Sequence, residues 1–403
     1  MKPLLYSVLP RPPHPTRDGL AIRNYHLLEA LAARFRVRAF SLRDPERAYG
    51  GGEFPPGVDA EFVAQAPRRA RRAGAALSSL VAGGAYSERL YRSGRLARRV
   101  ASLARREEPR WIVAHSYHVG PAALASAASG VPVWIDFHNL DSEIWDRTSR
   151  TASSATARRF ARLQAPRVRA LERRLVSAAA GVSCVSPRDA AGLAALRAAA
   201  APLVVPNGVD LARYALRPGA PGGERLLFVG DLSWPPNAEA VRWFAREVWP
   251  RVERARPAAS AEILGRSAPR DLKRLATPRL SFAGDRADTR PAWLAASVAV
   301  VPLLAGGGTR LKILEAAACG VPVVATPIGA EGLAFAPERE IRLREDAGGF
   351  ADAVVELLAD SEAARRQALA ARARVEALYD WRRIGEKFAR ALAESEERKR
   401  TRA

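Results

Sequence analysis

The sequence predicts an α/β protein built from two doubly wound, Rossmann-like domains. Three observations support this prediction: the length of 403 residues, the alternation of short apolar runs with helical patterns, and a Pro- and Gly-rich interruption near the middle. A chain of this length exceeds one ordinary hydrophobic core, so two domains are expected. Strands that alternate with helices are typical of parallel sheets covered on both faces.

The first domain is expected over residues 1–201. Its strands are predicted at Leu4–Leu9, Val37–Leu42, Trp111–Ala114, Val131–Asp136 and Gly181–Val185. Its helices are predicted at Ile22–Arg34, Ser87–Glu107 and Ala157–Ala178. The opening MKPLLYSVLPRPP breaks at Pro10, so we interpret it as a first core strand rather than a signal peptide.

A linker is expected over residues 202–223, which are rich in Pro and Gly. The second domain follows over residues 224–380. Its strands are predicted at Arg225–Val229, Ser260–Leu264, Leu280–Phe282, Val298–Leu303 and Val321–Ala325. Residues 381–403 predict a final helix from Trp381 with a charged end that frays.

One glycine-rich turn in the second domain predicts a phosphate site. An apolar run that begins at Val298 leads through this turn into a short helix. The turn consists of Gly306, Gly307 and Gly308. Such a turn presents backbone N–H groups and the positive end of a helix to an anion. On the helix, Lys312 and Glu315 share a face, so a cation and a carboxylate are available for the phosphate and the ribose of one nucleotide.

The chain is strongly basic, with a formal net charge of +22. Only five of its 64 basic residues are lysine, so 59 are arginine, a skew typical of coding bias with most of the charge on solvated helix faces. The alternative is attraction to an anionic membrane surface. Its candidate segments are Arg68–Arg72, between the loop-like Pro67 and Gly74, and the basic amphipathic stretch 157–176, which is otherwise a surface helix containing Pro166. Nucleic acid is not expected, because no zinc spacing or RNA-binding aromatic motif accompanies the charge.

The cysteine content and the hydropathy favour a cytosolic enzyme. Cys184 and Cys319 are the only cysteines, which provides neither a disulfide framework nor a metal cluster. No apolar run reaches the length of a membrane helix.

Four motifs follow one another in the second domain. They read FVGDLSWPPNAEAVRWF, EILGRS, FAGDRAD and GGGTRLKILEAAACGVPVVATPIGAEGL. In this order they resemble the retaining GT-B glycosyltransferases, the large group 1 family of bacterial polysaccharide and lipopolysaccharide sugar transferases, and the resemblance spans nearly the whole chain. It implies two Rossmann-like domains that face a central cleft, the first binding the acceptor and the second the donor, with the last helix crossing back onto the first.

The resemblance also implies how a nucleotide-sugar donor is held. Glu315 matches the carboxylate that binds both ribose hydroxyls, and Arg266 resembles the basic residue that reaches the diphosphate. Backbone groups at the glycine turns are implied to contact the phosphates, the sugar and the base. The implied donor residues are Gly19, Gly230, Asn237, Gly265, Arg266, Gly284, Gly306, Gly307, Gly308, Thr309, Arg310, Lys312 and Glu315.

The sequence departs from the family pattern at two places. Many relatives carry a second glutamate, separated from the first by seven residues, that contacts the transferred sugar, and here that position is Gly307. Either backbone amides hold the sugar hydroxyls, or the pocket accepts a different sugar. The segment Gly230–Asn237 lacks the Arg and Lys pair of many relatives, so we expect Arg310 and Lys312 to form the diphosphate clamp instead.

The first domain supplies the implied catalytic and acceptor residues. His115 follows a predicted strand at the position of the family's active-site histidine, and His118 is the alternative. Asp136, His138 and Asn139 follow another strand, where they either contact the acceptor or cap the strand end.

The expected reaction is metal-independent transfer with retention of configuration. No Asp-x-Asp pair occurs in the chain, so no metal or other cofactor is expected. Helix N-termini and basic side chains would stabilise the charge on the leaving diphosphate. The leaving phosphate itself can take the proton of the incoming hydroxyl.

The expected partners are a nucleotide sugar and a glycan or lipid-linked acceptor, with the enzyme cytoplasmic or peripheral at the inner face of the cytoplasmic membrane. Two other functions stay open. A sugar-nucleotide 2-epimerase shares the fold, and a degenerate transferase could act as a partner in polysaccharide assembly.

Overall fold

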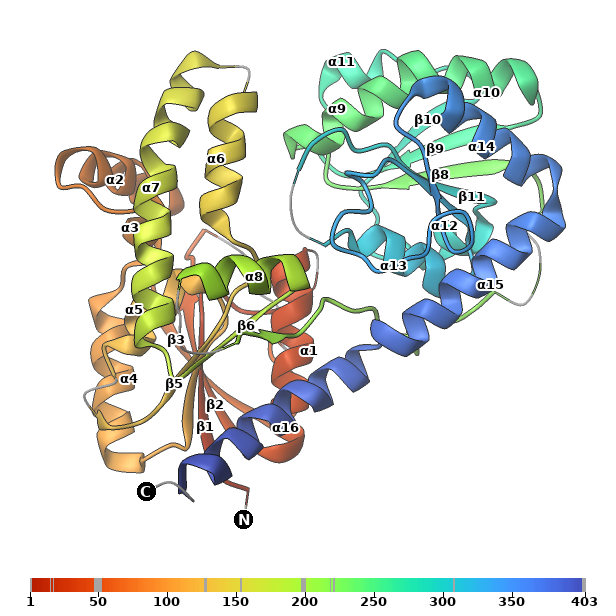
Figure 1. Cartoon of the computed structure of the whole chain (residues 1–403). Helices are drawn as coiled ribbons and strands as arrows, with labels where there is room; N and C mark the ends of the chain where they lie inside the picture. Colours follow the sequence, from red (N-terminus) through yellow and green to blue (C-terminus); the bar gives the residue numbers. More distant parts are fainter. Residues whose placement is uncertain are drawn as a thin grey trace. The chain divides into compact units, whose positions relative to one another are not determined.

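The structure is a computed structural model that describes residues 2–14, 16, 18–46, 53–126, 129–152, 154–196, 201–217, 219, 222–306 and 309–400, the side chains only as far as residue 395. The chain divides into two compact units. Unit 1 comprises the residues up to Pro206 and those from Arg382 onward, and unit 2 comprises Asn207–Trp381. Each unit is a parallel sheet with helices on both faces, which confirms the predicted fold class (Figure 1).

The described part of unit 1 forms a seven-stranded parallel sheet in the order β3-β2-β1-β4-β5-β6-β7. The strands are β1 (Leu4–Leu9), β2 (Arg36–Arg43), β3 (Val58–Ala64), β4 (Trp111–Ala114), β5 (Val133–Asp136), β6 (Gly181–Cys184) and β7 (Leu203–Val204). The helices are α1 (Gly19–Arg34), α2 (Arg68–Val81), α3 (Tyr86–Tyr91), α4 (Gly94–Glu107), the 3-10 turn η1 (Tyr117–Val119), α5 (Gly120–Leu124), α6 (Asp141–Thr151), α7 (Ala155–Ala178), α8 (Pro187–Leu196) and α16 (Trp381–Arg400).

The described part of unit 2 forms a six-stranded parallel sheet in the order β10-β9-β8-β11-β12-β13. The strands are β8 (Arg225–Val229), β9 (Ser260–Leu264), β10 (Leu280–Gly284), β11 (Val298–Val301), β12 (Val323–Ala325) and β13 (Arg342–Leu343). The helices are α9 (Pro235–Trp243), the π-helical turn η3 (Phe244–Val248), α10 (Trp249–Ala255), α11 (Arg270–Lys273), α12 (Arg290–Ala295), α13 (Leu311–Ala318), α14 (Ala347–Ala359) and α15 (Ser361–Leu378).

The two faces of the unit 2 sheet enter separate hydrophobic cores. Along β11, Ala299 and Val301 pack against one core, which α13 and α15 complete, while Val298 and Val300 pack against the other, which α9, α10 and α14 complete. Successive side chains of a strand point to opposite faces, so a strand buried on both sides is a continuous apolar run. This explains why strands such as β11 and β12 could be predicted from the sequence.

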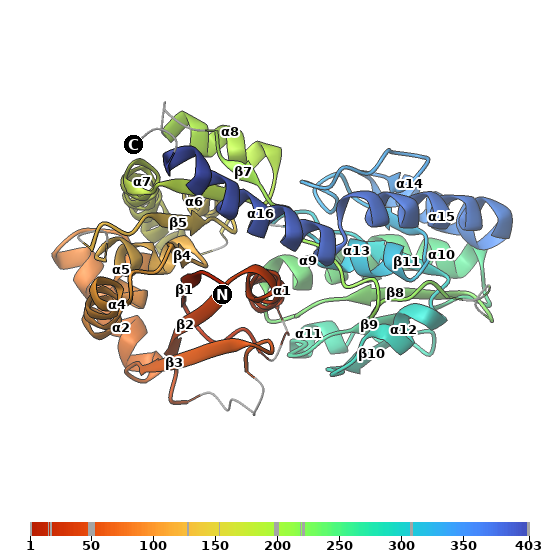
Figure 2. The ribbon, with the colours of Figure 1, turned by 90° about the horizontal axis from the view of Figure 1, so that it is seen from below.

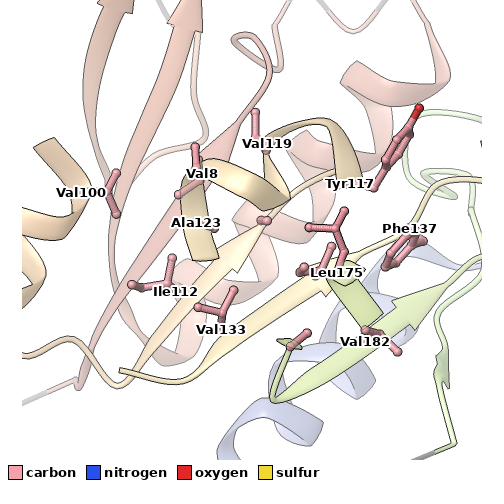
Figure 3. Packing of buried hydrophobic residues seen from close by; sticks show 14 of the residues in the cluster. Val8, Val100, Ile112, Tyr117, Val119, Ala123, Val133, Phe137, Leu175 and Val182 are labelled. Carbon is pink, nitrogen blue, oxygen red and sulfur yellow. The ribbon is translucent and has the colours of Figure 1, made fainter. Parts of the chain in front are cut away.

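The unit 1 sheet is likewise covered on both faces. Helices α4, α5 and α7 pack on one face, where Ile112, Val133 and Leu175 meet in the core (Figure 3). The other face carries α1 and α16 (Figure 2). The indole of Trp111 donates to the carbonyl oxygen of Leu392 in α16 at 3.0 Å, so the C-terminal helix is part of unit 1.

Several elements differ from the sequence prediction, among them the short strands β7, inside the expected linker 202–223, and β13, which was not predicted. Gly74 was interpreted as loop-like but lies inside the helix α2, because a glycine lowers helix propensity without ending a helix. The predicted helix Ser87–Glu107 is two helices, since the Ser93 side chain caps a new helix by accepting from the N–H of Leu96. The edge strand β3 escaped prediction because most of its residues are not buried, so it lacks a continuous apolar run.

No described helix is long and apolar enough to cross a bilayer.

Candidate functional site

Three neighbouring strands of unit 2 end at glycines, which we call the glycine edge: Gly230 after β8, Gly265 after β9 and Gly284 at the end of β10. The Gly230 N–H donates to the carbonyl oxygen of Leu264 at 3.0 Å, and the Gly265 N–H donates to that of Gly284 at 2.8 Å. A Cβ atom on Gly265 would lie 1.9 Å from the Gly230 carbonyl oxygen, so only glycine fits there. The glycine edge lies at the carboxyl ends of parallel strands, where open α/β sheets bind ligands.

Lys312 brings a cation to this edge. Its Nζ atom donates to the Asn237 side-chain oxygen at 3.1 Å and lies 4.0 Å from the centre of the Phe228 ring. A Cβ atom on Gly230 would lie 2.9 Å from the same Nζ, so the glycine leaves the ammonium room beside the backbone. Burial, with the nearby charge of Arg310, lowers the pKa of Lys312 to about 7. The structure therefore brings together three predicted donor residues, Gly230, Asn237 and Lys312.

Glu315 lies one turn further along α13 and is half-buried. The Trp293 indole donates to its Oε2 at 3.1 Å, which orients the carboxylate. Burial raises the pKa of Glu315, although hydrogen bonds from Trp293 and Tyr214 and the charge of Lys312 act in the opposite direction. Sequence reasoning missed Trp293 and Tyr214, because nothing in their local sequence links them to Glu315.

Arg266 and Arg310 are held by protein groups. Arg266 forms an ion pair with Asp231, with Nε 2.7 Å and Nη2 2.6 Å from one carboxylate oxygen. Arg310 is 4% exposed, and its guanidinium lies 5.9 Å from the centre of the Trp234 ring. To contact a diphosphate, Arg266 therefore has to leave Asp231 or bind both groups at once. The sequence did not indicate this ion pair.

The described part of the glycine-rich turn includes Gly306 and Thr309, while Gly307 and Gly308 lie outside the described residues. Gly306 has a φ of +124° and faces the Trp234 ring, which a Cβ atom would approach to 2.8 Å. Helix α13 begins only at Leu311, whose N–H donates to the Thr309 carbonyl oxygen at 3.2 Å. The helix thus starts later than a direct continuation of the three glycines would suggest.

In unit 1, His115 lies at the end of β4 and is completely buried. Its Nε2 atom is 3.1 Å from the hydroxyl oxygen of Ser7 on β1. Burial lowers the pKa of His115 to about 3, so the ring is neutral near pH 7. The His115 ring has no exposed surface in this structure.

Asp136 at the end of β5 is also completely buried. Arg23 of α1 donates to both of its oxygens at 2.7 Å, and the Ser183 hydroxyl donates to Oδ1 at 2.6 Å. The Nε2 atom of His138 lies 3.2 Å from Oδ2. Burial acts to raise the pKa of Asp136, but the charge and hydrogen bonds of Arg23 hold it far below its usual range. Asp136 was expected either to contact the acceptor or to cap the strand end, and these contacts match capping of the strand end.

His118 lies in η1 and keeps part of its ring at the surface. Its Nδ1 atom is 2.6 Å from the hydroxyl oxygen of Ser116, and its ring packs against Tyr91 and Tyr117 at centroid distances of 4.6 and 4.2 Å. Tyr117 stacks in turn on Phe137, with its hydroxyl at the margin of the core cluster (Figure 3). Of the two candidate histidines, His118 is the one that the structure leaves partly exposed.

Two carboxyl groups near Tyr117 were missed by sequence reasoning, the half-buried one of Asp141 and the buried one of Glu172. The Tyr117 hydroxyl donates to Oδ2 of Asp141 at 2.7 Å, and that oxygen lies 3.8 Å from His118 Nε2. Glu172 of α7 is fully buried and accepts from the Ser142 N–H at 3.1 Å. Burial raises the pKa of Asp141 to about 6 and that of Glu172 to about 7. Glu172 looks like a surface residue of a charged helix in the sequence, which is why it was overlooked.

The remaining predicted residues of unit 1 lie at exposed or half-buried positions. Gly19 is the exposed first residue of α1, whose N-terminus is capped by Asp18. Asn139 is half-buried in the turn between β5 and α6. Across the described residues, no group of three or more His, Cys, Asp or Glu side chains is placed to hold a metal ion.

Comparison with known proteins finds two family models in succession along the chain. The model described as "Glycosyl transferase 4-like domain" matches residues 18–208, and the model described as "Glycosyl transferases group 1" matches residues 223–360. Among curated proteins, the chain is 28% identical over 293 residues to glycogen synthase of Mycobacterium tuberculosis, an alignment that covers 68% of this chain and 64% of that protein. It is 31% identical over 188 residues to phosphatidyl-myo-inositol mannosyltransferase of Mycolicibacterium smegmatis. That alignment covers 44% of this chain and 48% of that protein. The chain thus spans slightly less than two thirds of the synthase and about half of the mannosyltransferase.

Solved structures share the fold over nearly the whole chain. Sucrose-phosphate synthase of Thermosynechococcus elongatus superposes with a TM-score of 0.70 at 19% identity, covering 98% of this chain and 99% of that one. HepE of Anabaena in complex with UDP superposes with a TM-score of 0.67 at 18% identity, covering 98% and 100%. At these identities the likeness is one of fold.

Proposed function

This chain belongs to the group 1 glycosyltransferases of the GT-B fold, and on that premise we propose that it transfers a sugar from a nucleotide diphosphate sugar to a hydroxyl acceptor. The observation that carries the proposal is the glycine edge of unit 2 with Lys312 and Glu315 beside it. Close backbone approach, one cation and one oriented carboxylate match the phosphates and the ribose of a single nucleotide.

The proposed role of Lys312 is to hold the diphosphate as it leaves. Cleavage of the bond between the sugar C1 and the diphosphate oxygen builds negative charge on the leaving group. A cation fixed beside that oxygen before the reaction stabilises this charge without reorganisation. Asn237 and the Phe228 ring already hold Nζ in place, so Lys312 does not have to be ordered when the donor binds.

Glu315 is proposed to accept hydrogen bonds from the two ribose hydroxyls, since an ionised carboxylate has two acceptor oxygens. Trp293 supports this role by fixing Oε2. His118 is proposed to donate a hydrogen bond to a substrate hydroxyl. We further propose retention of configuration without a metal ion, the leaving phosphate taking the acceptor proton; the lack of an Asp-x-Asp pair in the sequence supports the metal-free part.

The experiment is a thermal-shift panel of UDP-, GDP- and ADP-sugars, followed by a transfer assay with the donor that stabilises the protein most. UDP-glucose is the first choice because HepE was crystallised with it. Stabilisation by at least one nucleotide sugar, together with sugar transfer that persists in EDTA, is the expected result. If the protein binds none of the three nucleotide sugars, the proposed donor site is refuted. If the donor is epimerised in the absence of an acceptor, the result favours a 2-epimerase, a function that the comparisons with relatives do not favour.

We also propose that helix α2 rests on an anionic membrane, which would bring the enzyme to a lipid-linked acceptor. Ser79 on its buried side accepts from the Gln164 amide of α7 at 2.9 Å. The opposite side is exposed and apolar, with Leu77, Leu80 and Val81 at 64%, 53% and 80% exposure.

The charge of α2 supports an anionic surface as the partner. Its sequence RRARRAGAALSSLV contains no acidic residue. Arg69 and Leu80 share the exposed side, and no ion pair of Arg69 or Arg72 occurs within the described residues. Exposed apolar residues beside arginines without ion-pair partners are typical of a helix that lies in the plane of an anionic membrane surface.

Vesicle co-sedimentation tests this surface. The double variant Leu77→Ser/Leu80→Ser should lose binding to vesicles that contain phosphatidylglycerol, and the wild type should bind phosphatidylcholine vesicles weakly. Leu369→Ser, at a leucine of α15 that is 42% exposed, is the control and should bind like the wild type. Equal binding of both variants would exclude α2 as the contact.

A further inference from the structure

Ser116 has a backbone conformation that serine rarely adopts. It lies between β4 and η1 with φ 141° and ψ 144°, and it is 2% exposed. For a residue with a Cβ atom, such a conformation costs on the order of 1–3 kcal/mol and is maintained only when the surroundings require it. Glycine would adopt it without strain. A serine at this position therefore needs a reason that its hydroxyl can supply.

The hydroxyl of Ser116 contacts His118, which lies two residues further along the chain. Its Oγ atom accepts from the backbone N–H of His118 at 3.3 Å and lies 2.6 Å from the ring nitrogen Nδ1. A hydroxyl has a single proton and two lone pairs. Because one lone pair faces the backbone N–H, and because no other acceptor for the proton is found among the described residues, the hydroxyl donates to Nδ1.

This hydrogen bond determines where the imidazole carries its own proton. A neutral imidazole whose Nδ1 accepts has its proton on Nε2. The oxygen Oδ2 of Asp141 lies 3.8 Å from Nε2, which is beyond a hydrogen bond, so the Nε2–H stays available to a ligand oxygen. Burial, together with His138, lowers the pKa of His118 to about 3, so the ring is neutral near pH 7.

We infer that Ser116 is a positioning residue that fixes the orientation and the Nε2–H tautomer of His118, so that the imidazole donates to a substrate hydroxyl. The inference rests on the proposed function, because His118 acts there as the donor to the substrate. It explains why a strained serine occupies a turn that glycine would fill more easily. Tyr91 and Tyr117, which pack against the ring, restrict its tilt but provide no proton.

Ser116→Gly separates positioning from simple turn formation. Glycine removes the strain, so the thermal midpoint of the variant should equal or exceed that of the wild type. Its kcat should nevertheless fall by about tenfold to hundredfold, with a smaller change in the donor KM, because the imidazole is no longer oriented. Ser126→Gly, at another buried serine of unit 1 whose hydroxyl has no hydrogen-bond partner among the described residues, is the matched control and should keep the wild-type kcat.

Long-range ¹H–¹⁵N NMR reads the tautomer without any assay of activity. The chain has only five histidines, and the variant His118→Gln assigns the signal. The wild type should show His118 as the Nε2–H tautomer, and Ser116→Gly should show a mixture of both tautomers. An unchanged tautomer in Ser116→Gly, or an unchanged kcat, would overturn the positioning role. A tautomer shift in a protein that transfers no sugar would support the positioning of His118 while refuting the proposed function.

Discussion

Donor affinity should fall steeply as the pH rises above 7, and Lys312→Met should abolish that dependence. Lys312 is held at the glycine edge by Asn237, and burial lowers its pKa to about 7. The free enzyme is therefore about half protonated at pH 7. A bound diphosphate favours the ammonium form, so binding above pH 7 requires the uptake of a proton.

The magnitude follows from that pKa. If the complex keeps Lys312 protonated throughout, the donor Kd is inversely proportional to the fraction of free enzyme that carries the proton on Lys312. Between pH 7 and pH 9 the Kd should rise roughly 50-fold, equivalent to about 2.3 kcal/mol. Protonation contributes to binding fully below pH 7 and progressively less above it.

Isothermal titration calorimetry with a nucleotide sugar measures this dependence from pH 6 to 9, because both phosphates of such a donor are already ionised in that range. Lys312→Met should bind weakly at every pH, with a flat profile. Lys273→Met, at an exposed lysine of α11 in the same unit, is the matched control and should keep the wild-type slope. A wild-type Kd that does not change between pH 7 and 9 would refute a titrating Lys312 at the diphosphate.

Three further predictions concern stability. Gly265→Ala should destabilise unit 2 by about 1–3 kcal/mol or more, because its Cβ would meet the Gly230 carbonyl oxygen, and a thermal midpoint equal to that of the wild type would contradict this contact. Asp136→Asn should cost about 3–5 kcal/mol in urea unfolding, since it leaves the Arg23 guanidinium buried without its counter-charge; a loss below 1 kcal/mol would argue against a buried pair. The raised pKa of Glu172 means that the wild type loses unfolding free energy as the pH rises from about 4.5 to about 7, by up to about 3 kcal/mol. Glu172→Gln should lack this loss, and parallel pH profiles of the two proteins would refute it.

The glycine edge explains why the arrangement of these unit 2 residues could be predicted from the sequence. Each strand end there is marked by a glycine next to an apolar run, so sequence alone indicated where the backbone allows close approach. Lys312 and Glu315 are only three residues apart on one helix, and helical periodicity therefore brings them to the same side. The partners of these two residues are distant in sequence, and Asn237 alone was singled out.

The unit 1 residues show where sequence reasoning stopped. His115 and His118 both follow the same strand, and the sequence could not decide between them. The tertiary structure separates them, because His115 is completely buried against Ser7 while His118, in η1, keeps part of its ring exposed. His115 directly follows β4, whereas His118 lies three residues further on in the 3-10 turn, and only packing reveals where each side chain goes.

The sequence by itself determined the α/β class, the buried strands and the glycine-marked turns of this protein, because these follow from local apolar periodicity and from the absence of a Cβ atom. Only the tertiary structure decided which charges are committed to partners. Arg266 is paired with Asp231, and Arg23 with Asp136, across 35 and 113 residues of sequence. Ion pairs and pKa values depend on distance in space and on burial, and neither quantity can be read from neighbouring residues in the chain.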